Sequence, residues 1–274
     1  MAGLAGPLLL AGCGRMGGAL LQGWIDKGLP PTEAFVVEPD GAARERAREA
    51  FGVVAVGEVK ALPDDLEPRA LVVAVKPQAM ATTLPAYRPL VERGAVVLSI
   101  AAGTTIARFE AAFGDGTPVV RAMPNTPAAI NQGASALVAN SRVSEEQKAL
   151  CLELMRAVGD ALWLDDEEQI HVVTAMSGGG PAYVFLLIEA LAQAGAANGL
   201  PDELAIRLAR ATVIGSGALA ASDPAPAAEL RRNVTSPGGT TEAALAVLLD
   251  DASGLQRLLN AAIAAAVRRS HELG

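Results

Sequence analysis

A glycine-rich segment near the start of the chain has the spacing of a dinucleotide-binding loop. It matches the pattern G-x-G-x-x-G and directly follows the apolar run Leu8–Ala11. In such a loop the first glycine makes a tight turn, the second lets backbone approach a pyrophosphate, and the third lets helix and strand pack closely. The phosphate then rests on the helix N-terminus. The alternative is a purely structural turn. The residues expected to contact the cofactor are Gly12, Cys13, Gly14, Arg15, Met16 and Gly17.

An acidic residue follows the second apolar run, where it could select between two forms of that cofactor. Glu38 stands about 20 residues after Gly17, the interval at which an acid holds the adenosine ribose hydroxyls. A carboxylate there also repels the 2′-phosphate of NADPH and favours NADH. Because Arg44 and Arg46 lie close enough to meet a phosphate, NADPH and NADH both stay open. A solvated acid at a strand end is the alternative explanation of Glu38.

Three further turns, each after an apolar run, are candidates for the same site. They are Ala74-Val75-Lys76-Pro77, Ala101-Ala102-Gly103 and the proline-framed Asn125. In open α/β sheets, ligands bind beyond the carboxyl ends of the strands. The small residues at 101–103 let backbone approach the nicotinamide ring, and Asn125 is placed to hydrogen-bond its carboxamide. The alternatives are a solvated Lys76, an ordinary strand-to-helix turn and a structural proline turn.

The rest of the chain offers little acid–base, metal or thiol chemistry. Its two histidines, His171 and His271, have no metal-cluster spacing, and Cys13 is better explained as a small loop residue than as a nucleophile. No lysine follows Lys148, although a hydroxy-acid dehydrogenase needs a general base, usually His or Lys. A cyclic imine that arrives protonated needs positioning more than acid–base chemistry.

These turns require a sheet in the first half of the chain to position them. Continuous Val/Leu/Ala runs are typical of strands buried on both faces, which predicts a parallel sheet. Helices are expected at Met16–Lys27 and Ala42–Phe51. The predicted strands are Leu8–Ala11, Ala34–Val37, Ala70–Val75, Val96–Ile100 and Val119–Ala122, with a sixth candidate at Ser135–Val138.

After Ala161 the strand signals end and helical patterns take over, so we predict domains at residues 1–162 and 163–274. Pro181 suits the first turn of a helix. The middle helices are apolar on most faces and must be buried, which favours a homo-oligomer over an Ala-rich monomeric bundle. The predicted helices are Glu167–Met176, Pro181–Gly199, a helix from Pro201 to Ala220, Glu242–Asp250 and Gly254–Glu272.

Composition bounds the possible partners and location of the protein. The net charge of −8 argues against nucleic-acid binding, and two cysteines in 274 residues argue against a disulfide framework. The segment from Met1 has no basic start typical of a leader peptide. Glu189 and Gln193 interrupt the apolar stretch 182–197, so no membrane span is predicted and a cytoplasmic location is expected.

Four segments in order along the chain, with the glycine loop, resemble the pyrroline-5-carboxylate reductase family over nearly its whole length. They are Ala74–Pro77, Met123–Pro127, Ser177–Tyr183 and Ser236–Thr241, of which the last is the most specific. The chain departs from the family pattern at Gly179, where serine is common, and at Glu38, where the family often has a small or phosphate-tolerant residue.

The resemblance implies an α/β Rossmann-type parallel sheet domain followed by an all-α dimerisation domain. In that family the helices interleave between subunits, and the active site lies between the first domain of one subunit and helices of its partner. Rings of dimers also occur. The family reduces the imine acid 1-pyrroline-5-carboxylate to L-proline with NADPH or NADH, the last step of proline biosynthesis.

The resemblance also implies roles for single residues. The turn Ala74–Pro77 and Asn233 contact the cofactor, and Thr241 hydrogen-bonds the ring nitrogen as the catalytic residue. Glu167 lines the substrate pocket; from the sequence alone, it is better explained as a solvated acid. Gly238 and Gly239 are expected to free N–H groups for the substrate carboxylate at the positive end of a helix. The predicted substrate contacts are Glu167, Ser236, Gly238, Gly239, Thr240 and Thr241.

Two other functions stay open beside imine reduction. The β-hydroxyacid dehydrogenases share a similar layout but place a lysine early in the helix that joins the domains. The stretch 181–197 has no lysine, which weighs against that activity. A catalytically silent nucleotide-binding protein is the other alternative.

Overall fold

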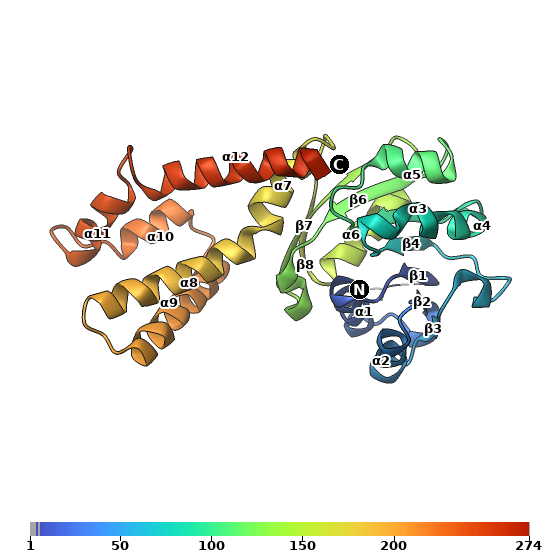
Figure 1. Ribbon diagram of the computed structural model, residues 1–274, viewed down its shortest axis with the longest axis horizontal. Coiled ribbons are helices and arrows are strands. Elements are labelled where there is room, and N and C mark those ends of the chain that lie inside the picture. Colours follow the sequence, from blue (N-terminus) through green and yellow to red (C-terminus); the bar gives the residue numbers. More distant parts are fainter. Residues whose placement is uncertain (1–3, 5, 274) are drawn as a thin grey trace. The chain divides into compact units, whose positions relative to one another are not determined.

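The computed structural model describes residues 4 and 6–273, which form two compact units (Figure 1). Unit 1 contains the chain up to Gly178 together with the segment from Val267, and unit 2 contains Gly179–Ala266. Residues 1–3, where the leader-peptide expectation begins, and residue 274, the end of the second expected domain, lie outside the described residues. The compact units divide after Gly178, and the boundary at residue 162 stays a prediction.

Unit 1 is built on an eight-stranded sheet with the order β3-β2-β1-β4-β5-β6-β7-β8. All neighbouring strands are parallel except β6 and β7. The chain leaves β1 towards β2 on one side and returns to β4 on the other, and this reversal is where open α/β sheets bind ligands. The strands are β1 (Leu8–Ala11), β2 (Ala34–Val37), β3 (Val54–Val56), β4 (Ala70–Val73), β5 (Val96–Ser99), β6 (Val119–Met123), β7 (Gly133–Ala139) and β8 (Gly159–Trp163).

Helices cover both faces of this sheet, so its central strands β1, β4 and β5 are buried along their whole length. On one face Leu20 and Trp24 pack against Leu154, and on the other Met80 and Phe109 contact the strands. The helices of unit 1 are α1 (Arg15–Asp26), α2 (Gly41–Phe51), α3 (Met80–Thr83), α4 (Arg88–Val91), α5 (Ile106–Phe113), α6 (Glu145–Arg156) and α7 (Gln169–Val173), which continues as a π-helical turn (Thr174–Gly178).

The predicted elements of unit 1 need three corrections. The sheet is not wholly parallel, because β7 runs against β6. The connection between these strands, residues 124–132, is shorter than the dozen or more residues that a parallel crossover needs. Strands predicted at Ala70–Val75 and Val96–Ile100 end earlier, at Val73 and Ser99. The strands and helices without a sequence prediction are β3, β8, α3, α4, α5 and α6.

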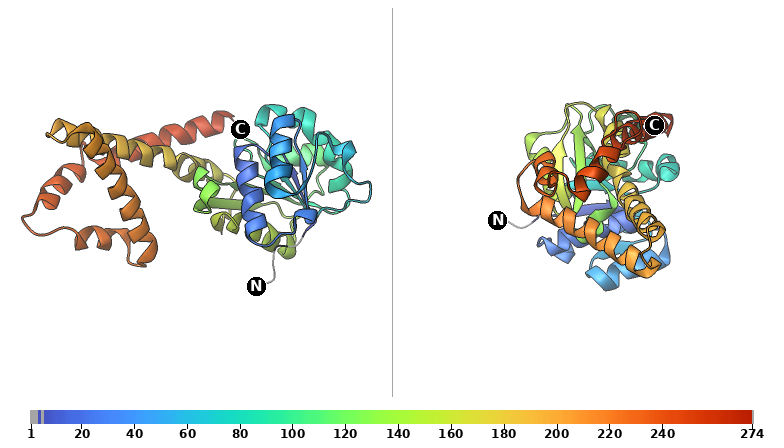
Figure 2. Two further views of the ribbon diagram at one scale, coloured as in Figure 1. Left: turned by 90° about the horizontal axis from the view of Figure 1, so that it is seen from below. Right: turned by 90° about the vertical axis from the view of Figure 1, so that its left-hand side faces the viewer.

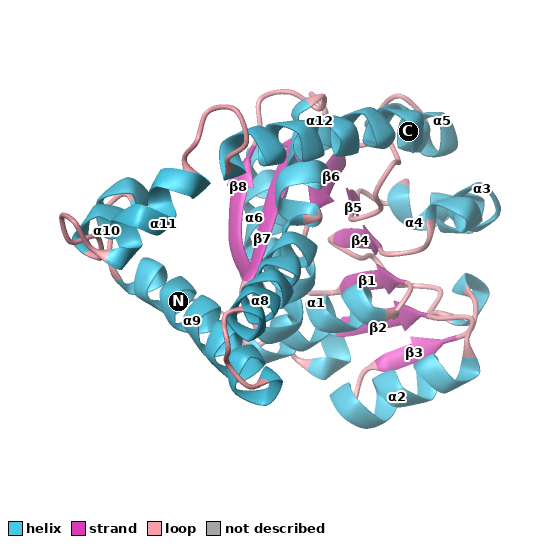
Figure 3. Cartoon of the chain, turned by 60° about the vertical axis from the view of Figure 1, so that its left-hand side comes forward, coloured by secondary structure: helices cyan, strands magenta, loops and turns pink. Residues whose placement is uncertain are grey.

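Unit 2 contains helices and no strand among its described residues (Figure 3). They are α8 (Gly180–Ala197), α9 (Asp202–Ser222), α10 (Ala227–Asn233), α11 (Thr240–Leu248) and α12 (Leu255–Leu273), of which the part from Val267 belongs to unit 1. Pro181 lies in the first turn of α8, as predicted. Helix α10 was not predicted.

Helices α8 and α9 lie side by side (Figure 2). Both expose large apolar side chains within the chain. Phe185 is 58% exposed and Ile214 61% exposed. By length and composition alone, the segments Gln169–Ala197 and Asp202–Ser222 are long and apolar enough to cross a membrane. The interruption at Glu189 therefore does not remove the first segment from that class. Large apolar side chains gathered at the surface in this number are typical of a face that another molecule covers.

Candidate functional site

The glycine loop joins β1 to α1 at the point where the sheet reverses direction. Gly12 has a φ of 91°, and a Cβ added to it would lie 3.0 Å from the carbonyl oxygen of Ala74. A Cβ on Gly17 would collide with the carbonyl oxygen of Gly12. A Cβ on Gly14, by contrast, would meet no atom within 4 Å. The first and third glycines are thus required by packing, while the second leaves an open side that fits a pyrophosphate.

The start of α1 is suited to an anion. Gly14 caps the helix without a side-chain hydrogen bond, and the first turn contains no acidic residue. The first N–H groups of a helix have no acceptor within it, and they attract negative charge. Arg15, exposed in this first turn, adds a positive charge. These features fit the phosphates of a dinucleotide.

Glu38 is fixed beside the glycine loop at the end of β2. Its Oε2 accepts the N–H of Cys13 at 2.7 Å, and its Oε1 accepts the N–H of Asp40 at 2.9 Å. Arg44 Nη1 donates to the carbonyl oxygens of Glu38 and Pro39 at 2.9 and 3.2 Å. The alternative of a freely solvated acid is therefore wrong. A hydrogen bond from ribose hydroxyls to this carboxylate stays a prediction.

A cleft of about 400 Å³ opens beside these residues. Its lining includes Gly12, Gly14 and Glu38 together with the predicted turn residues Ala74, Val75 and Lys76. Pro77, the last residue of that turn, begins a short 3-10 turn. The rest of the lining was not predicted, because it comes from the segment after the short β3, from α3 and from the 3-10 turn that follows α3. Its residues include Gly57, Glu58, Val59, Thr82, Thr83 and Tyr87.

The thiol of Cys13 and the phenol hydroxyl of Tyr87, both near the cleft, remain protonated at neutral pH. Burial and then the charge of Glu38 raise the pKa of Cys13 to about 11, with a smaller opposing effect of Arg46. Burial, with Glu38 again adding to it, also raises the pKa of Tyr87 well above its usual value. Cys13 therefore lacks the thiolate that a nucleophile needs, which agrees with its interpretation as a small loop residue.

The turn Ala101–Gly103 follows β5, and the end of the chain lies against it. Gly103 has a φ of 70°, and a Cβ added there would lie 2.9 Å from the carbonyl oxygen of Leu273. The N–H of Ala101 donates to Ser99 Oγ at 3.3 Å. Glycine at position 103 thus permits both the backbone conformation and the approach of α12. A contact of this turn with nicotinamide stays a prediction.

Asn125 uses its amide within the protein. Its Nδ2 donates to the carbonyl oxygen and Oγ of Ser177 at 3.2 and 3.4 Å, and its Oδ1 accepts the N–H of Ala134 at 2.9 Å. The side chain thereby joins β7 to the π-helical turn after α7. These bonds support the structural alternative for this turn, and a bond to the carboxamide stays a prediction.

Glu167 forms a partly buried ion pair. Its Oε1 lies 2.9 Å from Nη1 of Arg121, which is only 1% exposed, and also accepts the N–H of Ile106 at 2.9 Å. A buried guanidinium requires a partner of this kind, because an unpaired buried charge is strongly destabilising. Glu167 is therefore not the solvated acid that its neighbours suggested. A contact with the substrate stays a prediction.

The segment Ser236–Thr241 lies in unit 2 and comprises the turn after α10 and the first two residues of α11. Gly238 has a φ of 71° and donates its N–H to Glu242 Oε2 at 2.7 Å. Gly239 donates its N–H to the carbonyl oxygen of Ser236 at 3.0 Å. The expectation that these two glycines free their N–H groups is thus wrong, because the loop itself uses both.

The anion-binding potential of this loop instead lies one residue further along. Gly239 is the N-cap of α11 and, as a glycine, caps it without a side-chain hydrogen bond. Thr240 and Thr241 occupy the first turn of the helix. Their N–H groups have no acceptor within the helix. Thr241 is exposed, and Asn233, the last residue of α10, is exposed as well.

Comparisons with known proteins agree with these observations. The family model described as pyrroline-5-carboxylate reductase dimerisation matches residues 167–273, and that described as NADP oxidoreductase, coenzyme F420-dependent, matches residues 8–103. A pyrroline-5-carboxylate reductase of Pseudomonas aeruginosa is 43% identical over 96% of this chain and 94% of that protein.

Solved structures extend the likeness to the whole fold. A pyrroline-5-carboxylate reductase from Coxiella burnetii has a TM-score of 0.92 and 35% identity, and the match covers 98% of both chains. A Plasmodium falciparum pyrroline carboxylate reductase with NADP bound has a TM-score of 0.81 and 27% identity, covering 100% of both chains. The Rossmann-type unit and the helical segment thus occur together in these proteins, and the chain belongs to the pyrroline-5-carboxylate reductase family.

Proposed function

We propose that the chain catalyses the NAD(P)H-dependent reduction of 1-pyrroline-5-carboxylate to L-proline. The observation that carries this conclusion is a dinucleotide cleft at the reversal point of the sheet, in a chain that belongs to this family over nearly its full length. When bound, NAD(P)H supplies the hydride for the imine carbon. The electron pair of the C=N bond then remains on a nitrogen that already carries its proton, so the protein has mainly to position the ring.

An absorbance assay of NAD(P)H oxidation tests this function. We expect turnover with pyrroline-5-carboxylate and either nicotinamide cofactor, and none with a panel of hydroxy acids and the oxidised cofactors. Turnover with a hydroxy acid alone would favour a dehydrogenase of the β-hydroxyacid type. Cofactor binding without turnover of any substrate would favour a silent nucleotide-binding protein.

For the cofactor, the position of Glu38 supports a preference for NADH over NADPH. Its carboxylate is held by the N–H groups of Cys13 and Asp40, close to the glycine loop. The nearest arginine of α2, Arg44, is engaged by main-chain carbonyls and does not neutralise this carboxylate through an ion pair in the described structure. A 2′-phosphate on the ribose would face a fixed negative charge without a cation paired to that charge.

For the substrate, the first turn of α11 is the proposed site of the carboxylate. The N–H groups of Thr240 and Thr241 and the positive end of the helix supply the attraction. Ser236, Gly238 and Gly239 shape the loop that precedes this turn. We place the ring nitrogen at the hydroxyl of Thr241, which steadies it through a hydrogen bond. Glu167 and Asn233 remain further candidates for substrate and cofactor contacts.

For the assembly, we propose a homodimer in which the exposed apolar faces of α8 and α9 are covered by the partner. Support comes from the exposure of Phe185 and Ile214 and from the dimerisation model, which spans both helices. Burial in a dimer also explains why two segments are apolar enough to cross a membrane, because the partner and not lipid would then cover them. A ring of such dimers and a cytoplasmic location complete the proposal. Sedimentation of the purified protein without detergent tests it.

A further inference from the structure

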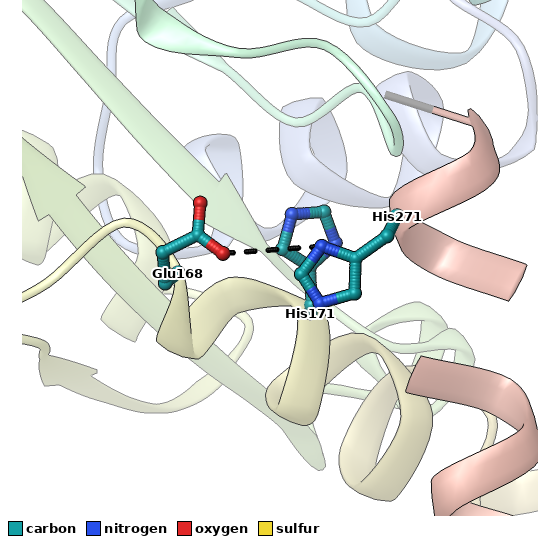
Figure 4. A group of neighbouring side chains, drawn as sticks. All are labelled: Glu168, His171 and His271. Atoms are coloured by element: carbon teal, nitrogen blue, oxygen red, sulfur yellow. Dashed lines mark ion pairs between the residues drawn. The ribbon is translucent and has the colours of Figure 1, made fainter. Parts of the chain in front are cut away.

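The two histidines of the chain meet a carboxylate at the surface of unit 1 (Figure 4). Glu168 directly precedes α7, His171 lies within it, and His271 lies in the last turns of α12. One possible ligand atom from each of the three lies within 4.8 Å of the others. The imidazole rings stack with their centroids 3.9 Å apart, and His271 Nδ1 is 3.8 Å from Glu168 Oε2.

The ring of His171 is held in place through one of its two nitrogens. The residue is only 5% exposed, and its Nδ1 lies 2.8 Å from Oγ of Ser270, which is itself buried. Ligating histidines usually have their second ring nitrogen held in this way, which fixes the ring and leaves the other nitrogen for the metal.

We propose that Glu168, His171 and His271 form a site for a divalent transition metal of the zinc class, completed by water. Two imidazole nitrogens and one carboxylate oxygen are a donor set that zinc accepts in tetrahedral sites. Such a site brings ligand atoms to about 3.3 Å from one another. Glu168 and His271 have side chains that are 72% and 49% exposed, so they can turn towards the buried ring of His171.

The metal would act as a clamp between segments far apart in the sequence. It would join the start of α7 to the last turns of α12, both within unit 1. Leu273, close behind His271, lies so near Gly103 that a Cβ added to this glycine would be 2.9 Å from its carbonyl oxygen. A bound ion would therefore stabilise the end of α12 against the turn after β5. The role is structural, and the hydride transfer does not pass through it.

Metal titration of the full chain, purified without a histidine tag and stripped with a chelator, tests the site. We expect Co²⁺ and Zn²⁺ to bind at about one ion per chain, with visible Co²⁺ absorption of a tetrahedral site and a higher Tm. Because the chain has two histidines, NMR of the imidazole protons reports on both ligands, and Zn²⁺ should shift both together. Pyrroline-5-carboxylate reductase activity is measured separately, so that failure of the metal site and failure of the proposed function can be told apart.

Variants of the exposed ligands decide the outcome. His271→Ala and Glu168→Gln should each weaken metal binding by more than about tenfold, since even groups that only orient a ligand contribute about 10- to 100-fold. Asp165→Asn, which changes a neighbouring exposed acid outside the cluster, is the matched control and should bind as tightly as the parent chain. Circular dichroism checks that each variant is folded. Absence of binding by the parent chain, or equal binding by all variants, overturns the proposal.

Discussion

Replacing Glu38 with glutamine should reduce the proposed preference for NADH while leaving the fold intact. Glutamine keeps an oxygen that accepts the N–H of Cys13 and removes the charge. In the parent chain, a unit charge about 4 Å from the carboxylate costs about 1 kcal/mol in water and about 4 kcal/mol at an effective dielectric constant near 20. Glu38 is half-buried, so we expect an intermediate penalty of about 2 to 3 kcal/mol for the 2′-phosphate.

That penalty corresponds to a preference for NADH of about 30- to 150-fold in kcat/KM. The assay measures kcat/KM for both cofactors at a fixed saturating concentration of pyrroline-5-carboxylate. Glu38→Gln should bring the ratio down by about tenfold or more, chiefly by improving NADPH. Because the repulsion acts at a partly solvated site, the parent preference should also narrow as ionic strength rises.

Glu58 provides the matched control for this experiment. It lines the same cleft, but its carboxylate is 60% exposed and pairs with Lys60 at 3.0 Å. Glu58→Gln should therefore change the cofactor ratio only slightly. The reasoning is refuted if the parent chain prefers NADPH, or if Glu38→Gln and Glu58→Gln have the same ratio as the parent.

Four further outcomes follow from the other contacts. Thr241→Val should lower kcat/KM for the imine by about 10- to 100-fold with an unchanged Kd for NADH, whereas Thr241→Ser should retain most activity; unchanged kcat/KM in Thr241→Val would remove the assigned role. Glu242→Gln should lower the KM for the imine acid by several-fold, because it removes a negative charge beside the proposed carboxylate site; a raised KM would contradict this. Glu167→Ala should destabilise the fold by about 3 to 5 kcal/mol in urea titrations, since it leaves Arg121 buried and unpaired, while Lys60→Ala, at an exposed pair, should cost less than about 1 kcal/mol. In a Cys151→Ser background, the alkylation rate of Cys13 plotted against pH should have its inflection near pH 11 instead of 9. The stability that the protonated thiol contributes should be present below pH 9 and decline as pH rises towards 11. An inflection near pH 9 would show that burial does not raise the pKa of this thiol.

Local patterns predicted the parts of the molecule whose causes are local. The glycine loop, β1 and β2 were predicted within a residue because a buried strand, a tight turn and a helix start each depend on adjacent residues. Strand β3 has only three residues and no periodicity, so the wall of the cleft that follows it had no signal. The antiparallel β7 could have been recognised from the shortness of the connection that precedes it.

Partners distant in the sequence explain most of what the patterns missed. Glu167 lies in a run of acids that is typical of a solvated surface, and only the fold brings it to Arg121, which is 46 positions away. Asn125 contacts Ser177 at a separation of 52 positions. The two histidines show no metal spacing along the chain, yet the fold stacks their rings. Residue type alone cannot show which polar side chains have a partner elsewhere in the fold.

The loop before α11 shows why a motif locates a site more reliably than it assigns individual atoms. Its glycines indicated a turn with backbone donors, and the left-handed φ of Gly238 agrees. Yet the donor of Gly238 is occupied by Glu242, only four positions further along. An incoming carboxylate must then either displace that side chain or use the first turn of α11. Without substrate, the Glu242 carboxylate thus accepts the Gly238 N–H that the motif suggested for the substrate carboxylate. The KM of Glu242→Gln for the imine acid measures this competition between the two carboxylates directly.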